Sequence, residues 1–401
     1  MIKLQDTYTK KNDDISNAPV VRFIDSIISK AIEERASDIH IEPYNDYTKI
    51  RFRVDGSLHE VVKISKQTMP AIITRIKIIS NLNIAEKRLP QDGRYVFILD
   101  KKEYDLRISI IPTVFGEKVV IRILDRNNFL LPMVKLGFDE EDAKSLHQII
   151  NQPHGIILLT GPTGSGKSTT LYSLLNELNV QSKSIITIED PVEYIMEGIS
   201  QIQVNLKTGF TFAEGLRSIL RQDPDILMVG EIRDAETARI AVRAAITGHL
   251  VFSTLHTNDA PSTITRLIDM GVEPFLLPSS IIASIAQRLV RKICLNCMYE
   301  YNASENEKGI LGISKSSDLK LYRGRGCSQC NNTGYYSRTG VYEIMVINDE
   351  YRSAIINNNG CDEIKQINKR LGMKTLKDSC AKLVIQGITT MDELLKITYA
   401  N

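Results

Sequence analysis

The apolar residues at the start of the chain follow helical spacing and then strand spacing. Between residues 20 and 32 they recur every three or four positions, which predicts a helix, whereas residues 49–54 (KIRFRV) alternate strictly between polar and apolar. Asp55-Gly56 follows this alternation and is a hairpin signal. Further predicted elements are a strand from Asp38, a helix over residues 68–83, a turn over residues 90–94 (PQDGR), and strands over residues 94–99, 104–111 and 117–124. Together they predict an α+β domain over residues 19–124.

A different order of elements begins after residue 135. From residue 136 to residue 290, apolar strands alternate with helical segments, which is the order that builds a parallel sheet with loops at the strand ends. The predicted strands are residues 154–161, 184–190, 225–231 and 249–256. The rest of the chain divides into a polar tail (1–18), a linker without periodicity (125–135), a glycine-rich segment with cysteine pairs (291–345) and a helical region (346–401). The fold class is therefore a multidomain α/β protein.

The composition of the 401 residues fits a folded protein of two or three domains, with 43% hydrophobic and 24% charged residues. A net charge of +2 gives no support for bulk binding to nucleic acid. The polar start of the chain lacks the apolar core of a signal peptide, and no run of about eighteen apolar residues occurs. We therefore expect a cytosolic protein that meets the membrane only through a partner.

Residues 161–169 (GPTGSGKST) match the phosphate-binding pattern G-x-x-x-x-G-K-[ST] at every fixed position. A buried-strand pattern precedes them and helical spacing follows, as the mechanism requires. The backbone N–H groups would surround the phosphates, Lys167 would reach the terminal ones, and the Ser168 hydroxyl would bind Mg²⁺. The predicted nucleotide-binding residues are Gly161, Pro162, Thr163, Gly164, Ser165, Gly166, Lys167, Ser168 and Thr169.

Two of the later strands end in acidic residues. Glu189 lies at the end of the strand predicted over residues 184–190, and Glu231 follows the apolar run DILMVG. Acids at strand ends behind a phosphate loop favour catalysis over helix capping or surface charge. Glu189 would position or deprotonate the attacking water and Glu231 would support metal and water, although the two roles can be exchanged.

Two histidines bracket the last strand predicted for the parallel sheet. His249 and His256 are seven positions apart, so a strand would place them on opposite faces. This spacing argues against a shared metal. One of them is a candidate sensor of nucleotide or water, and the other is then structural.

Four of the six cysteines form two C-x-x-C pairs separated by 29 residues. Cys294, Cys297, Cys327 and Cys330 suffice for a structural four-thiolate zinc site, which a reducing compartment favours over disulfides. Redox activity is the weaker alternative. Cys361 and Cys380 lie outside the pattern and are predicted to be ordinary thiols.

Several long segments resemble the traffic ATPases of type II secretion and type IV pilus assembly. They are ASDIHIEP, AEKRLPQDGR, GPTGSGKSTTLY, TIEDPVEY and LRSILRQDPDILMVGEIRDAETARIAVRAAITGHLVFSTLHTNDA. The resemblance covers nearly the whole chain from about residue 19. It implies a PAS-like amino-terminal domain, a RecA-like ATPase motor domain and a tetracysteine zinc insert, with ATP, Mg²⁺ and Zn²⁺ as cofactors.

The resemblance also implies a homohexameric ring that works beneath an inner-membrane platform protein, at the inner face of the cytoplasmic membrane. ATP would lie between the amino-terminal and motor domains, with arginines from other domains or subunits completing the site. The matching catalytic positions are Arg107, Arg122, Arg217 and Arg233, and Arg221, Arg266 and Arg338 match further family arginines. Guanidinium suits phosphoryl oxygens because its fork is planar and always charged.

The chain departs from the family in two places. Many members carry a further amino-terminal docking domain, whereas about eighteen polar residues precede the first predicted helix here, which leaves that docking mode open. Ser337 stands where the family often has glycine.

The sequence is interpreted as an ATP-hydrolysing motor for pilus or secretion pseudopilus assembly. A DNA-uptake pseudopilus motor is the alternative within the class, and pilus retraction is less favoured because retraction members usually lack the cysteine insert. From other classes, a scaffold that binds ATP without turnover should lack a catalytic acid. A nucleic-acid translocase should have a basic domain and stacking aromatics.

Overall fold

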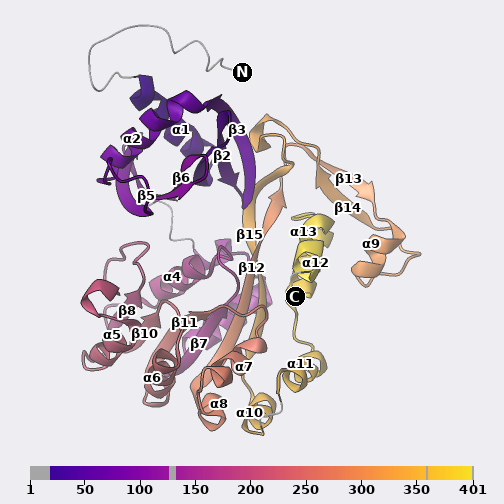
Figure 1. The fold of residues 1–401 in the computed structure, drawn as a ribbon. Coiled ribbons are helices and arrows are strands. Elements are labelled where there is room, and N and C mark those ends of the chain that lie inside the picture. Colours follow the sequence, from indigo (N-terminus) through magenta and orange to yellow (C-terminus); the bar gives the residue numbers. More distant parts are fainter. Residues whose placement is uncertain (1–18, 126–131, 358–359, 400–401) are drawn as a thin grey trace. The chain divides into compact units, whose positions relative to one another are not determined.

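The computed structural model describes residues 19–125, 132–357 and 360–399. The chain forms two compact units, one up to Phe129 and one from Leu130 onward, and each is described here by itself (Figure 1). The predicted tail and residues 126–131 of the predicted linker lie outside the described residues.

The first unit is built on a six-stranded antiparallel sheet with the order β3-β2-β1-β6-β5-β4. Its strands are β1 (Ala36–Pro43), β2 (Tyr47–Val54), β3 (Ser57–Ser65), β4 (Gln91–Leu99), β5 (Lys102–Thr113) and β6 (Gly116–Asp125). Asp55 and Gly56 have φ of 48° and 85°, so the β2–β3 hairpin turns at the predicted dipeptide.

Two helices, α1 (Pro19–Glu33) and α2 (Met69–Ile79), supply the apolar side chains that complete the core of this unit. Ile24, Ile28 and Ile72 are among the buried residues that join the inward-facing side chains of the sheet. Alternate residues of the strands are polar, so the opposite face of the sheet carries mainly charged groups.

Two predictions for this unit need correction. The helix predicted over residues 68–83 ends at Ile79, and the segment 90–94 is not a turn, because β4 already begins at Gln91. Gly93 is paired with Ile108 inside the ladder. A methyl group on Gly93 would lie 2.7 Å from the carbonyl oxygen of Ser80, so this glycine permits close contact with the end of α2 rather than a chain reversal.

The second unit contains a seven-stranded sheet with the order β15-β12-β7-β11-β10-β8-β9. Six of these strands run parallel to one another, and the edge strand β15 is antiparallel to its neighbour β12. The strands are β7 (Gly155–Thr160), β8 (Ile185–Glu189), β9 (Ser200–Gln203), β10 (Ile226–Val229), β11 (Leu250–Leu255), β12 (Ile281–Ile293) and β15 (Tyr335–Val346). The four strands predicted for the motor domain are all present and parallel, which confirms the α/β class.

Helices surround this sheet and end the chain (Figure 1). In chain order they are α3 (Glu140–Ile150), α4 (Lys167–Leu178), α5 (Phe212–Ile219), α6 (Ala235–Ile246), α7 (Ser262–Asp269), α8 (Leu277–Ser280), α9 (Glu305–Ile310), α10 (Asp349–Ile356), α11 (Gly360–Arg370), α12 (Leu376–Ile385) and α13 (Met391–Tyr399). Both α4 and α6 contact β7, whose residues are all buried. The strand that precedes the phosphate loop therefore lies wholly inside the core.

The cysteine segment is continuous with two strands of the seven-stranded sheet. The predicted boundary between residues 290 and 291 falls inside β12, which runs on to Ile293 next to the first cysteine. The chain then forms the hairpin of β13 (Met298–Asn302) and β14 (Lys320–Gly324) and returns along β12 as β15. The strands β12 and β15 connect the seven-stranded sheet to the cysteine segment (Figure 1).

Candidate functional site

The phosphate loop connects the end of β7 at Thr160 with the start of α4 at Lys167. Gly166 is the residue before the helix and has φ of 91°, and Gly161 has φ of 146°, conformations that favour glycine. The first N–H groups of α4 have no acceptor within the helix, so they and the helix dipole favour an anion here. The loop has the conformation that its sequence pattern predicts.

Lys167 lies almost wholly inside the loop. It is 8% exposed, and its Nζ donates to the carbonyl oxygens of Gly161 at 2.7 Å and Pro162 at 3.1 Å. Burial lowers the pKa of Lys167 to about 8; the negative charge of Glu231 opposes this shift and the positive charge of Arg288 adds to it. The ammonium is therefore placed for an anion but poorly solvated until one binds.

The remaining loop residues divide into exposed and buried groups. Pro162, Thr163, Gly164 and Ser168 are exposed, and Gly166 and Thr169 are half-buried. Ser165 is 3% exposed, and its hydroxyl faces the protein interior beside Gly161. Ser168 stands in the first turn of α4 with an exposed side chain, which is where a hydroxyl can reach a phosphate-bound cation.

Glu189 is a buried carboxylate with hydrogen bonds to three side chains of the protein. It is 4% exposed at the end of β8, and Tyr172 of α4 donates its hydroxyl to Oε2. Oε1 accepts from the Thr187 hydroxyl at 2.7 Å and from Gln201 at 3.2 Å. Burial, together with the charge of Glu189 and this hydrogen bond, raises the pKa of Tyr172 above its usual range.

Glu231 is more accessible and has basic neighbours. It follows β10, its side chain is 16% exposed, and its Oε1 lies 2.6 Å from Arg233. Its Oε2 lies 3.4 Å from Nε2 of His256, which directly follows β11. The charge of Glu231 also acts on Lys167. The structure thus brings Lys167, Glu231, Arg233 and His256 to one end of the parallel sheet.

The other predicted residues of the second unit lie elsewhere. His249 precedes β11, at the opposite end of the strand from His256, and its Nδ1 lies 3.0 Å from the carbonyl oxygen of Ala244. Arg217 of α5 pairs with Glu236 and Glu214, and Arg221 donates to the carbonyl oxygen of Arg217. Arg266 is exposed on α7.

The two predicted arginines of the first unit are neighbours across its sheet. Arg107 of β5 is directly opposite Arg122 of β6. Arg122 is 57% exposed and lies 3.3 Å from Asp38 of β1, which also pairs with Arg53 at 3.6 Å. Like charges opposite each other on a sheet repel, and Asp38 supplies a negative charge beside Arg122.

The four predicted cysteines meet in one cluster, to which each C-x-x-C pair contributes both of its side chains. Their Sγ atoms all lie within 4.8 Å of one another, and Cys294–Cys327, Cys297–Cys330 and Cys327–Cys330 are 3.8, 3.8 and 3.7 Å apart. A tetrahedral zinc site with Zn–S bonds of about 2.3 Å requires sulfur separations of this size. Backbone N–H groups of Gly326, Cys327 and Gly334 also point at the sulfurs.

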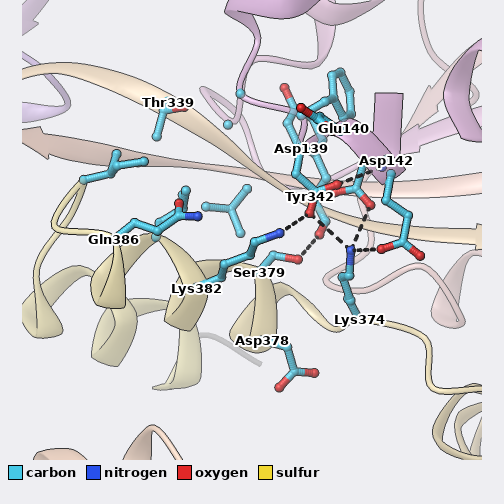
Figure 2. A pocket seen from close by; sticks show the side chains of 17 residues that line it. Asp139, Glu140, Asp142, Thr339, Tyr342, Lys374, Asp378, Ser379, Lys382 and Gln386 are labelled. Carbon is cyan, nitrogen blue, oxygen red and sulfur yellow. Dashed lines mark hydrogen bonds and ion pairs between the residues drawn. The ribbon is translucent and has the colours of Figure 1, made fainter. Parts of the chain in front are cut away.

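A cavity of about 600 Å³ lies beside the segment that leads into α3, between β15 and α12. Figure 2 shows two lysines reaching across it. Lys374 lies 2.7 Å from Glu141 and 3.2 Å from Asp139, and Lys382 lies 2.7 Å from Asp139. Burial opposes ionisation of Asp139, but hydrogen bonds from Asp142 and both lysines hold its pKa below the usual range. Both lysines therefore form ion pairs with carboxylates, whereas Lys167 donates to backbone carbonyl oxygens.

Three residues around the site were missed from the sequence. Tyr172 and Gln201 bind Glu189, and Arg288 of β12 lies next to the phosphate loop. Tyr172 and Gln201 give no local signal, because their partners are distant in the chain. Arg288 gives none either, because its strand mixes apolar and polar residues and its partner Asn258 is 30 residues away.

The fold and this site define a RecA-like phosphate-loop ATPase with an α+β amino-terminal unit. The model of the family described as "Type II/IV secretion system protein" matches residues 13–396. The chain belongs to this family and is an ATP-hydrolysing enzyme.

Relatives of known name are similar over most of their length. The chain is 49% identical over 382 residues to "Type II secretion system protein E" of Pseudomonas aeruginosa, covering 95% of this chain and 76% of the relative. It is 45% identical over 392 residues to "Type II secretion system ATPase E" of Vibrio cholerae, covering 97% and 78%. The predicted family is thereby confirmed.

Two solved structures share the fold. The Legionella pneumophila ATPase DotB has a TM-score of 0.72 at 21% identity, with 98% of this chain and 99% of that chain covered. The pilus retraction motor PilT with bound ADP has a TM-score of 0.63 at 29% identity, with 93% and 96% covered. Among the described residues of this chain, no helix is both long and apolar enough to cross a membrane.

Proposed function

We propose that this ATPase powers assembly of a type II secretion pseudopilus as a homohexameric ring at the inner face of the cytoplasmic membrane. A platform protein in that membrane would be its partner, and the chain itself would stay cytoplasmic. The relatives at 45% and 49% identity are named for type II secretion, which supports this machine over pilus retraction, since PilT is 29% identical. Nothing favours DNA uptake.

One observation supports the proposed site above all others. Lys167 lies at the same end of the sheet as Glu231, which contacts Arg233 and His256. Lys167 and the loop N–H groups hold the phosphates of ATP. A water oxygen forms a bond to the γ-phosphorus, the water gives a proton to Glu231, and the bond to the bridging oxygen breaks, leaving ADP and phosphate. His256 and Arg233 fix the carboxylate of Glu231 for this transfer.

We assign the general base to Glu231 and a positioning role to Glu189, which exchanges the two roles expected from the sequence. The oxygens of Glu189 already accept from Tyr172, Thr187 and Gln201, and the residue is 4% exposed. A base must be within reach of the water that it deprotonates. Glu189 instead ties β8 to α4, the helix that begins with Lys167.

Other predicted residues are assigned further contributions. Ser168 would hold Mg²⁺, which supplies charge neutralisation on the phosphate oxygens when bound. Arg217 and Arg233 from this unit, and Arg107 and Arg122 from the first unit, would stabilise the transferring phosphate, with Arg221, Arg266 and Arg338 in supporting places. His249 would be structural.

We also propose that Cys294, Cys297, Cys327 and Cys330 hold one Zn²⁺. The sulfur separations and the N–H groups directed at the sulfurs fit a closed four-thiolate site. Such a site supplies folding energy and no catalysis, because the four thiolates fill the coordination sphere.

Glutamine substitutions of the two acids test the assignment of the base. Glu231→Gln is expected to lower kcat by about 10²- to 10⁴-fold, because the proton acceptor is lost, while ATP binding stays within about threefold. Glu189→Gln should lower kcat by less than about tenfold, since Gln can still pair with Tyr172. Phosphate release gives kcat, and titration of a fluorescent ATP analogue gives the affinity.

Two further variants serve as controls for this experiment. Glu177→Gln, on the far part of α4, is the charge-matched control and should hydrolyse ATP at the unaltered rate. Lys167→Ala should abolish phosphate binding. Normal turnover in Glu231→Gln, with turnover lost in Glu189→Gln, would restore Glu189 as the base.

A further inference from the structure

Arg288 is a buried charge without an acidic partner in the described part of the chain. It is 8% exposed on β12, and its guanidinium forms no ion pair with any carboxylate described there. Burial lowers the pKa of Arg288, and Glu343 and Asp259 oppose this only through their charges. Burying a charge without a carboxylate partner is costly, so the guanidinium depends on the hydrogen bonds that it makes.

The guanidinium binds the loop that follows β11. Its Nη2 donates to the carbonyl oxygen of Asn258 at 2.9 Å and lies 3.4 Å from the Asn258 side-chain oxygen. Its Nη1 donates to the carbonyl oxygen of Gln287 at 3.2 Å. Asn258 is two residues beyond His256, which contacts Glu231. The position of Arg288 therefore bears on the position of His256.

The same guanidinium lies against the first glycine of the phosphate loop. A methyl group on Gly161 would lie 3.1 Å from Nη1 of Arg288 and 2.5 Å from the carbonyl oxygen of Gln287. Thr160, just before this glycine, accepts the N–H of Thr257 at 2.8 Å. Strand β12, the start of the phosphate loop and the loop after β11 thus meet at Arg288.

The far end of the loop after β11 is fixed in a similar way. The N–H of Ala260 donates to Oε1 of Glu343 at 2.9 Å, and the other carboxylate oxygen of Glu343 accepts the N–H of Leu376 at 3.1 Å. Glu343 is 4% exposed on β15. Between His256 and Ala260, then, buried side chains of two neighbouring strands hold the backbone.

We propose that Arg288 is a positioning residue for ATP hydrolysis, which sets the distance between the phosphate loop and the His256–Glu231 pair. This rests on the site proposed above. Arg288 acts through the backbone of Asn258 and does not touch the nucleotide. The planar fork is needed because it bonds two carbonyl oxygens at once, and a lysine ammonium has no such fixed geometry. A misplacement of about 1 Å in such a site costs on the order of 100-fold in rate.

Arg288→Lys and Arg288→Met test this role, with Arg291→Met as the matched control. Arg291 lies on the same strand and pairs with Glu393 at 2.8 Å, away from the phosphate loop. Both Arg288 variants are expected to lower kcat by about 10- to 100-fold with ATP affinity within about threefold, and Lys should retain more activity than Met. Arg291→Met should lower thermal stability and leave kcat within about twofold.

The His256→Ala background separates positioning from a general structural role. If Arg288 works through the loop that carries His256, Arg288→Lys should add less than about a twofold loss of kcat in that background. Full additivity, or an unchanged kcat in both Arg288 variants, would overturn the proposal. A loss of nucleotide affinity above about tenfold would overturn it in favour of direct phosphate contact. Lys167→Ala is measured alongside, because normal turnover there would refute the underlying site instead.

Discussion

At the residue scale, Lys167 shows how the protein prepares a charge for its ligand. Its pKa of about 8 results first from burial, and Glu231 limits the shift. The unfolded chain has a lysine pKa near 10.5, so between about pH 8 and pH 10.5 it binds more protons than the folded chain. The contribution of Lys167 to the free energy of unfolding therefore increases with pH across this window.

Nucleotide affinity should depend on pH with the opposite sign. Phosphate oxygens require charged Lys167, so raising the pH above about 8 removes the proton from the free protein and weakens binding, by about tenfold per pH unit at the limit. The phosphates of ATP lose their last proton near pH 6, below this range. Titration of a fluorescent, non-hydrolysable ATP analogue between pH 7 and about pH 9.5 measures the effect.

Lys167→Arg is the control, because its guanidinium stays charged throughout. This variant should bind the analogue more weakly at every pH but with a nearly flat profile. An equally flat profile in the unaltered protein would show that Lys167 stays charged in the free loop.

At the element scale, local patterns predicted those parts of the fold whose interactions are local. The strands β7, β8, β10 and β11 are apolar runs, and the phosphate loop and cysteine pairs are fixed spacings. Strand β12 was not predicted, since its sequence mixes apolar residues with Gln287, Arg288 and Arg291. The partners of the two arginines, Asn258 and Glu393, are 30 and 102 residues away, so no local pattern contains them.

The candidate site divides in the same way. The residues of the phosphate loop were predictable because the motif has them at fixed spacing. The choice between Glu189 and Glu231 instead depends on Tyr172, Gln201 and His256, which only the fold brings to them. The sequence also did not reveal the backbone conformation of Ser337, which has a φ of 71° at the irregular start of β15. A glycine, which the family resemblance leads us to expect at this position, would adopt the same conformation without strain.

The cysteine segment gives an element-scale prediction. The isolated protein should contain about one equivalent of zinc, and Cys327→Ser should contain less than about half, because three thiolates hold the metal weakly. Cys361→Ser is the control, since Cys361 lies on α11 outside the cluster, and it should keep the full content. Elemental analysis of the folded, reduced proteins measures both. Metal-free but folded unaltered protein would indicate four free thiols.

At the scale of the whole molecule, the arginines expected at the transferring phosphate lie in two compact units. Arg107 and Arg122 face each other on the sheet of the first unit, and the phosphate loop belongs to the second. Like charges that lie opposite each other on a sheet repel, so we expect an anion near Arg107 and Arg122. In a ring, the phosphates bound by one subunit can be that anion for the first unit of its neighbour.

A mixing experiment tests whether Arg107 acts between subunits. Arg107→Ala should lower kcat far more than affinity, since arginines that stabilise transferring phosphate contribute about 10³- to 10⁵-fold in related enzymes. Rings that combine Arg107→Ala chains with Lys167→Ala chains contain some interfaces with an intact loop facing an intact arginine. For random mixing at equal amounts, about a quarter of the sites are complete, so up to about a quarter of the activity should return. Each variant alone, at the same total concentration, is the control. Inactive mixtures, with ring assembly confirmed by light scattering, would place Arg107 at the nucleotide of its own chain.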